Sequence, residues 1–171
     1  MKRFTFLLLV LVVAVACNDD NATGPTNLPL VFTASLLPAN EVPPVVNAES
    51  PGHGSVQVTF NVTRNAAGAI AASTASFYVQ LTGYPTSPTI TGAHIHPGVA
   101  GVNGGVIIST GLSATNPLSL HGGIIEFTSP TITVDPALMQ SIINSPSSFY
   151  FNVHSPLNSG GFSRGQLERI Q

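Results

Sequence analysis

One stretch of the chain, Ser55 to Thr63, alternates strictly between apolar and polar side chains. Residues i and i+2 of a strand share one face of a sheet, so this alternation places one face in an apolar core and the other in water. A strand buried on one side is typical of an antiparallel sheet. The stretch therefore predicts an antiparallel sheet whose core includes Val56, Val58, Phe60 and Val62.

Further β-prone stretches follow at short intervals along the chain. The sequence holds 16 glycines and 14 prolines, which favour frequent turns, while only 7% of its residues are charged. The other expected strands lie at residues 30–37, 69–82 (strongest at 75–81), 89–96, 106–108, 122–127 and 148–154, with a final strand within 162–171. The predicted fold class is all-β: an antiparallel, Greek-key-like β-sandwich or flattened barrel.

A single helix interrupts this pattern. Asp135 followed by Pro136 is a typical N-cap with a proline in the first helical position. The next residues place an apolar face at helical spacing, and Ser145-Pro146 ends it. We therefore expect one short helix beside the sheets.

The N-terminus has the pattern of an export signal. Lys2 and Arg3 precede an apolar run from Phe4 to Ala16, which is too short for a comfortable membrane span. Small residues then precede Cys17, as in a bacterial lipoprotein signal, whose cysteine is lipidated. The predicted division is a lipoprotein signal peptide at 1–16, a flexible tether at 17–28 and a folded domain at 29–171. The alternative is an ordinary secretory signal with an incidental cysteine.

This division predicts a location in the cell envelope, lipid-anchored and extracytoplasmic, with the membrane as a partner through Cys17. Without lipidation the protein would be secreted. Cys17 is the only cysteine, so an intrachain disulfide is impossible. Without residues 1–16 the chain keeps three arginines against seven acidic residues, a net charge of −4. Nucleic-acid binding is not expected, because phosphate neutralisation needs clustered basic residues.

The clearest candidate for chemistry is the pair His94 and His96, which precedes a glycine-rich loop. Their spacing places both imidazoles on one face of a strand. His154 ends another predicted strand before a second glycine-rich loop. Three converging imidazoles would make a mononuclear site for copper or zinc. The alternative is a polar cluster whose ring nitrogens satisfy loop carbonyls and amides.

Glu41 and Arg164 form a second candidate group. One hypothesis makes Arg164 an anion-binding residue near the histidine face. The other makes it an ion-pair partner of Glu41 or a clamp on backbone carbonyls, tying the loop 40–44 to the last strand.

An ordered set of motifs resembles the CHRD domain, a family named after chordin and also found in bacterial exported proteins. The resemblance spans residues 32–167 and implies an extracytoplasmic β domain. Its pieces are residues 32–36 with Asn40-Glu41-Val42-Pro43-Pro44, Ala93-His94-Ile95-His96 with its glycine-rich loop, Asp135, Tyr150-Phe151-Asn152-Val153-His154, and Arg164-Gly165-Gln166-Leu167. Phe162-Ser163 stands where the family usually has an acidic and an aliphatic residue.

No catalytic constellation accompanies these motifs. The sequence has no Gly-x-Ser-x-Gly elbow, no phosphate loop and no acidic pair at catalytic spacing. The strand of His94 and His96 also resembles the copper-binding strand of copper/zinc superoxide dismutase, but the zinc cluster and disulfide of that family are missing. The sequence thus favours a membrane-anchored binding or structural module over an enzyme, with its ligand unknown. The alternative function is a mononuclear, redox-active or redox-inert metal site.

Overall fold

The computed structural model describes residues 28–85, 89–119 and 125–171, whose strands form two main antiparallel sheets. The larger sheet has the order β12-β1-β2-β3-β8, and β9 also pairs with β3. Its strands are β1 (Leu30–Leu36), β2 (His53–Arg64), β3 (Ile70–Thr82), β8 (Ile125–Thr128), β9 (Ile132–Val134) and β12 (Glu168–Arg169).

The smaller sheet has the order β11-β10-β5-β6. Its strands are β5 (Gly92–Pro97), β6 (Ile108–Ser109), β10 (Phe149–His154) and β11 (Ser163–Gln166). A separate short pair consists of β4 (Thr89–Ile90) and β7 (Leu118–Ser119). Two 3-10 turns complete the described elements, η1 (Pro38–Asn40) and η2 (Pro146–Ser148).

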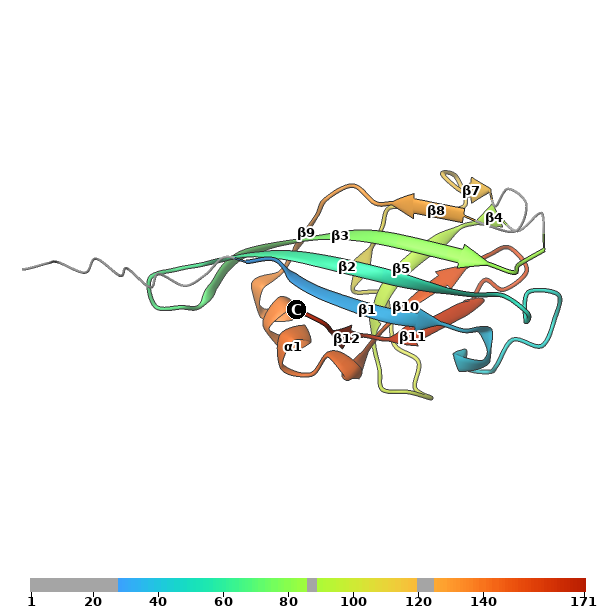
Figure 1. The fold of residues 1–171 in the computed structure, drawn as a ribbon, viewed down its shortest axis with the longest axis horizontal. Coiled ribbons are helices and arrows are strands. Elements are labelled where there is room, and N and C mark those ends of the chain that lie inside the picture. Colours follow the sequence, from blue (N-terminus) through green and yellow to red (C-terminus); the bar gives the residue numbers. More distant parts are fainter. Residues whose placement is uncertain (1–27, 86–88, 120–124) are drawn as a thin grey trace, which may run out of the picture.

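The two main sheets pack face to face around an aromatic core, with β5 and β10 crossing the long strands β1 to β3 in Figure 1. Phe77 of β3 and Phe151 of β10 join the sheets, with ring centroids 5.6 Å apart. Within the larger sheet, Phe32 and Phe60 meet edge to face at 5.4 Å. The predicted β-sandwich is confirmed, and the described strands form no closed barrel.

Strand β2 confirms the alternation from which the fold was predicted. Val56, Val58, Phe60 and Val62 are buried, whereas Gln57 and Asn61 are exposed. The strand pairs with β1 on one side and β3 on the other, so it lies inside the sheet. Its apolar face therefore contributes four neighbouring side chains to the core.

Helix α1 (Pro136–Asn144) begins and ends where the sequence predicted. The Asp135 side chain accepts hydrogen bonds from the backbone N–H groups of Ala137 and Leu138, both at 2.9 Å. These bonds satisfy donors that have no partner inside the helix. Met139 and Ile142 bury the apolar face of the helix in the core.

Some predicted strands have different boundaries in the structure. The expected strand 162–171 is divided, because β11 pairs with β10 of the smaller sheet and β12 pairs with β1 of the larger one. The buried Leu167 lies at this crossing. The run 89–96 is likewise divided into β4 and β5, and the predicted strand 106–108 is displaced to Ile108–Ser109. A crossing between sheets depends on distant partners, which the β propensity of a segment does not reveal.

The predicted signal peptide and most of the predicted tether lie outside the described residues, as do Cys17 and His121. Among the helices that are described, none has the length and apolar character needed to cross a membrane.

Candidate functional site

The strand register brings the predicted site residues to the outer face of the smaller sheet. His94 lies opposite Asn152, and His96 lies opposite Tyr150. On the other side of β10, Arg164 also lies opposite Asn152. Residues directly across an antiparallel pair project to the same face. One face therefore carries the histidines and the arginine, while the intervening apolar residues enter the core.

The structure brings His94, His96 and His154 together. One ring nitrogen from each lies within 4.8 Å of the other two. The ring centroids are 4.9 Å apart for His94 and His154, 5.7 Å for His94 and His96, and 5.9 Å for His96 and His154. Donors bound to one ion at about 2.0–2.1 Å would lie roughly 3.3–3.6 Å apart. Binding would thus draw the rings together by about 1 Å.

Backbone carbonyls orient two of the three rings. The Nδ1 atom of His96 lies 2.9 Å from the Gly104 carbonyl oxygen, and that of His154 lies 3.0 Å from the Ser159 carbonyl oxygen. A carbonyl can only accept, so each Nδ1 carries the proton and donates it. Each Nε2 consequently holds a lone pair. This second contact is typical of histidines that bind metal ions.

The remaining ring nitrogens are buried without a hydrogen-bond partner. They are Nδ1 of His94, Nε2 of His96 and Nε2 of His154. Burial is the largest influence on all three pKa values and lowers each of them. For His94, burial and the two neighbouring histidines bring the pKa to about 4. Neutral imidazoles leave lone pairs available to an ion.

Arg164 is almost completely buried, with 1% of its surface exposed. Its guanidinium donates to the Asn103 side-chain oxygen at 2.9 Å and to the Val102 and Val99 carbonyl oxygens at 2.9 and 3.3 Å. Arg164 thus clamps the glycine-rich loop that follows β5. Its own carbonyl accepts from the Asn40 side chain at 3.1 Å, which also ties the loop 40–44 to the last strands.

Tyr150 lies between Arg164 and the histidines. The guanidinium carbon of Arg164 is 3.5 Å from the centre of the Tyr150 ring. The His96 ring is stacked almost parallel to Tyr150, with centroids 4.9 Å apart and an interplanar angle of 6°. Since Arg164 and His96 come from the strands on either side of β10, the tyrosine separates the positive charge from the imidazole.

Glu41 lies on the same face, and its charge interaction with Arg164 acts through space. Both Glu41 carboxyl oxygens accept from the Asn152 side-chain nitrogen at 3.2 Å. A side chain at Gly161 would collide with this pair, since its Cβ would lie 2.7 Å from a Glu41 oxygen. Burial raises the pKa of Glu41 from 4.5 to about 7, and the nearby Arg164 charge lowers it to a smaller extent.

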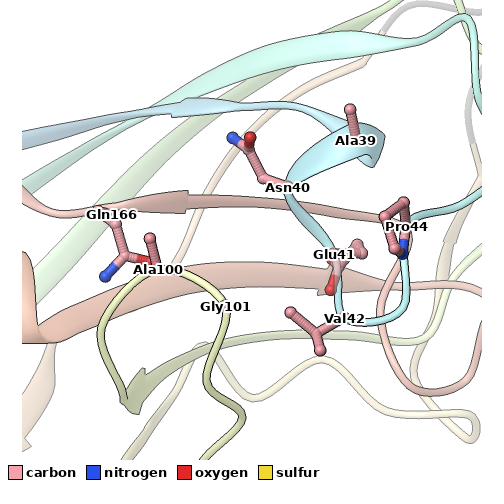
Figure 2. A pocket seen from close by; sticks show the side chains of 8 residues that line it. All are labelled: Ala39, Asn40, Glu41, Val42, Pro44, Ala100, Gly101 and Gln166. Atoms are coloured by element: carbon pink, nitrogen blue, oxygen red, sulfur yellow. The ribbon is translucent and has the colours of Figure 1, made fainter.

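Two cavities flank the loop that carries Glu41. One, of about 440 Å³, has Asn40, Glu41 and Val42 facing Ala100 and Gln166, as Figure 2 shows. The other, of about 420 Å³, lies between this loop and the loop 157–161. Both are walled by loops that also contact Arg164 or the histidines.

Sequence reasoning missed several residues that build this site. Tyr150, Asn152 and His154 are two residues apart on β10, and side chains two residues apart on a strand share a face. This spacing could have placed Tyr150 and Asn152 beside His154. Asn103 gave no comparable signal, because it belongs to a loop. It links two loops by donating to the Val42 carbonyl oxygen at 2.9 Å while accepting from Arg164. His53 is exposed on β2, outside the cluster.

Comparison with known proteins identifies the family of the chain. The family model of the CHRD domain matches residues 32–167. The matched range contains Glu41, the three clustered histidines and Arg164. No curated protein and no solved structure matches the chain.

Replacing Arg164 by lysine tests the clamp. An ammonium group cannot reproduce the planar fork that reaches three acceptors and stacks on Tyr150. We expect Arg164→Lys to lower the free energy of unfolding by about 3 kcal/mol, measured by urea denaturation. The control is Arg169→Lys at an exposed position, with an expected change below about 0.5 kcal/mol. Equal stability of both variants would contradict the clamp.

The raised pKa of Glu41 predicts a pH dependence of stability. Glu41 keeps its proton in the fold at pH values where the unfolded chain has lost it, so its stabilising contribution is full below pH 4.5 and disappears as the pH rises to about 7. The expected loss is about 3 kcal/mol. Glu41→Gln removes this slope and is the more stable protein above pH 7.

Urea denaturation of wild type and Glu41→Gln between pH 4.5 and 8 measures this slope. Glu168→Gln, on an exposed side chain, should follow the wild type. Parallel curves for wild type and Glu41→Gln would show that the buried carboxyl does not hold a proton.

Proposed function

The chain belongs to the CHRD domain family, and we propose that it is a membrane-tethered, extracytoplasmic module that binds one transition-metal ion through His94, His96 and His154. The family supports a binding or structural module. The arrangement of the three imidazoles supports the metal ion as the ligand.

Two observations on the same three side chains carry this proposal: each histidine has a ring nitrogen within 4.8 Å of one from each of the others, and each has a buried ring nitrogen without a hydrogen-bond partner. A buried polar atom without a partner costs about 1–3 kcal/mol. A single cation would satisfy all three at once. Copper and zinc both accept neutral imidazole donors, so either would fit this set.

A purely structural role for the histidines accounts for only half of their contacts. The Nδ1–H groups of His96 and His154 do hold the loops that contain Gly104 and Ser159. That role leaves the Nε2 atoms of His96 and His154 buried without a hydrogen-bond partner. Metal binding uses both sides of each ring, with the carbonyl contact fixing the orientation of the donor.

The position of β1 supports the tether. The strand begins at Leu30 beside Phe60 and ends at Leu36, after which the chain enters the Glu41 loop (Figure 1). A strand of seven residues spans roughly 20 Å. The Glu41 loop therefore lies at the other end of β1 from the segment that the tether would join. Multiple acyl chains on a cysteine give stable attachment.

Metal titration of the full chain tests the proposed ligand. We expect one zinc(II) or copper(II) ion per chain by elemental analysis after removal of unbound metal. His94→Ala, His96→Ala and His154→Ala should each weaken binding by about 100-fold, because each removes one donor. His53→Ala, at the exposed histidine, is the control. A stoichiometry far below one for zinc(II), copper(II) and copper(I) alike, or unchanged binding by the cluster variants, would reject the site.

Gly92→Ala provides a variant that changes no ligand. A Cβ there would lie 2.7 Å from His94 Cε1 and 3.3 Å from His154 Cδ2, so both rings would have to move. We expect weaker metal binding by at least about tenfold. Gly160→Ala, with open space around its Cβ, should bind as the wild type does.

Cell fractionation tests the anchor. Cys17→Ser removes the thiol that would carry the lipid, so we expect the protein to move from the membrane fraction to the soluble envelope fraction. Incorporation of a labelled fatty acid into wild type alone gives an independent readout. A soluble wild type without label would show that the leader is an ordinary secretory signal.

A further inference from the structure

We infer that the three-histidine centre selects a monovalent ion, copper(I), over zinc(II) and copper(II). This inference rests on the proposed metal site and specifies its ligand. It follows from the charge of the donors, the burial of their nitrogens and the position of Arg164.

The donor set carries no charge. Among the described residues, the cluster consists of three histidines without a carboxylate. The buried carboxylates nearby have other partners: Glu41 accepts from Asn152, and Glu49 accepts from Ser155 and Asn158. An ion bound to three neutral imidazoles therefore keeps its full charge.

Burial penalises a divalent ion more than a monovalent one. The donor nitrogens have almost no contact with water. The free energy needed to move an ion out of water rises with the square of its charge. It is therefore about four times larger for a divalent ion than for a monovalent ion of equal size. Zinc sites commonly offset this cost with thiolates or carboxylates. The described part of this site offers neither.

A positively charged side chain stacks on the tyrosine that also stacks on the cluster. Arg164 lies 3.5 Å from the Tyr150 ring, whose other neighbour is the parallel His96 ring. Repulsion from Arg164 is twice as large for a divalent ion as for a monovalent ion.

The number of donors agrees with this preference. The cluster supplies three nitrogens, and Gly92 beside it has no side chain to add a fourth. Zinc with three protein ligands takes a water molecule as its fourth ligand, which a buried site would have to admit. Copper(I), a d¹⁰ ion without a geometric demand for four ligands, is stable with three nitrogen donors.

Competition titrations of the full chain test the inference. Copper(I) is measured without oxygen against bicinchoninate, and zinc(II) and copper(II) are measured against chelators of known affinity. We expect copper(I) to bind at least about 100-fold more tightly than zinc(II). The bound copper couple should also have a reduction potential above that of aqueous copper. The result that overturns the inference is tighter binding of zinc(II), or a potential below the aqueous value.

The outcomes separate this inference from the proposed function. One zinc(II) or copper(II) per chain with weaker copper(I) binding would overturn the monovalent preference and leave the metal site standing. Absence of binding by all three ions would reject both.

Ser109→Asp tests the charge argument directly. Ser109 is exposed and lies opposite His94 in the register of β5 and β6, so an aspartate would place a negative charge beside the cluster. We expect the affinity ratio of copper(I) to zinc(II) to fall by about tenfold. Ser109→Asn is the neutral control and should keep the wild-type ratio. An equal ratio in both variants would show that charge does not set the preference.

Discussion

The buried guanidinium of Arg164 is the interaction on which the site depends. Its donors hold Asn103 and the carbonyl groups of the loop after β5, and its own carbonyl is held by Asn40. The charge is neutralised by carbonyl dipoles and the Tyr150 ring, while Glu41 acts on it through space. Removing a buried charge from such contacts leaves several acceptors without partners at once. The glycine-rich loop whose Gly104 carbonyl orients His96 therefore depends on one side chain for its position.

The smaller sheet separates two environments by the alternation of its strands. Ile95 and Phe151 enter the aromatic core, while His94, Tyr150 and Asn152 face the covering loops. Loops normally expose polar groups to water, but here they enclose a polar layer whose members satisfy one another. The exceptions among the residues named here are the Asn152 side-chain oxygen and one ring nitrogen of each clustered histidine. An ion between the three rings would bind ring nitrogens that no backbone carbonyl contacts.

Local patterns predicted the elements that depend on neighbours in sequence. The alternation from Ser55 to Thr63 and the Asp135 cap both reappear in the structure, because strand faces and helix ends follow from the backbone geometry of a few residues. The segment 162–171 is expected to contain one final strand, yet it divides between two sheets. Its partners β10 and β1 lie far away along the chain. The sequence of one segment therefore does not show which sheet that segment joins.

The sequence by itself determined that His94 and His96 share a face, since side chains on a strand repeat every two residues. It also marked His154, Glu41 and Arg164 as candidate site residues. Only the tertiary structure decided which nitrogens converge, because the carbonyl groups of Gly104 and Ser159 fix the rings from distant loops. The tertiary structure also decided that Arg164 donates hydrogen bonds to the carbonyl groups of a loop and that Glu41 accepts from Asn152. Hydrogen-bond partners depend on positions in space, and residues far apart in the chain acquire those positions only when the sheets pack.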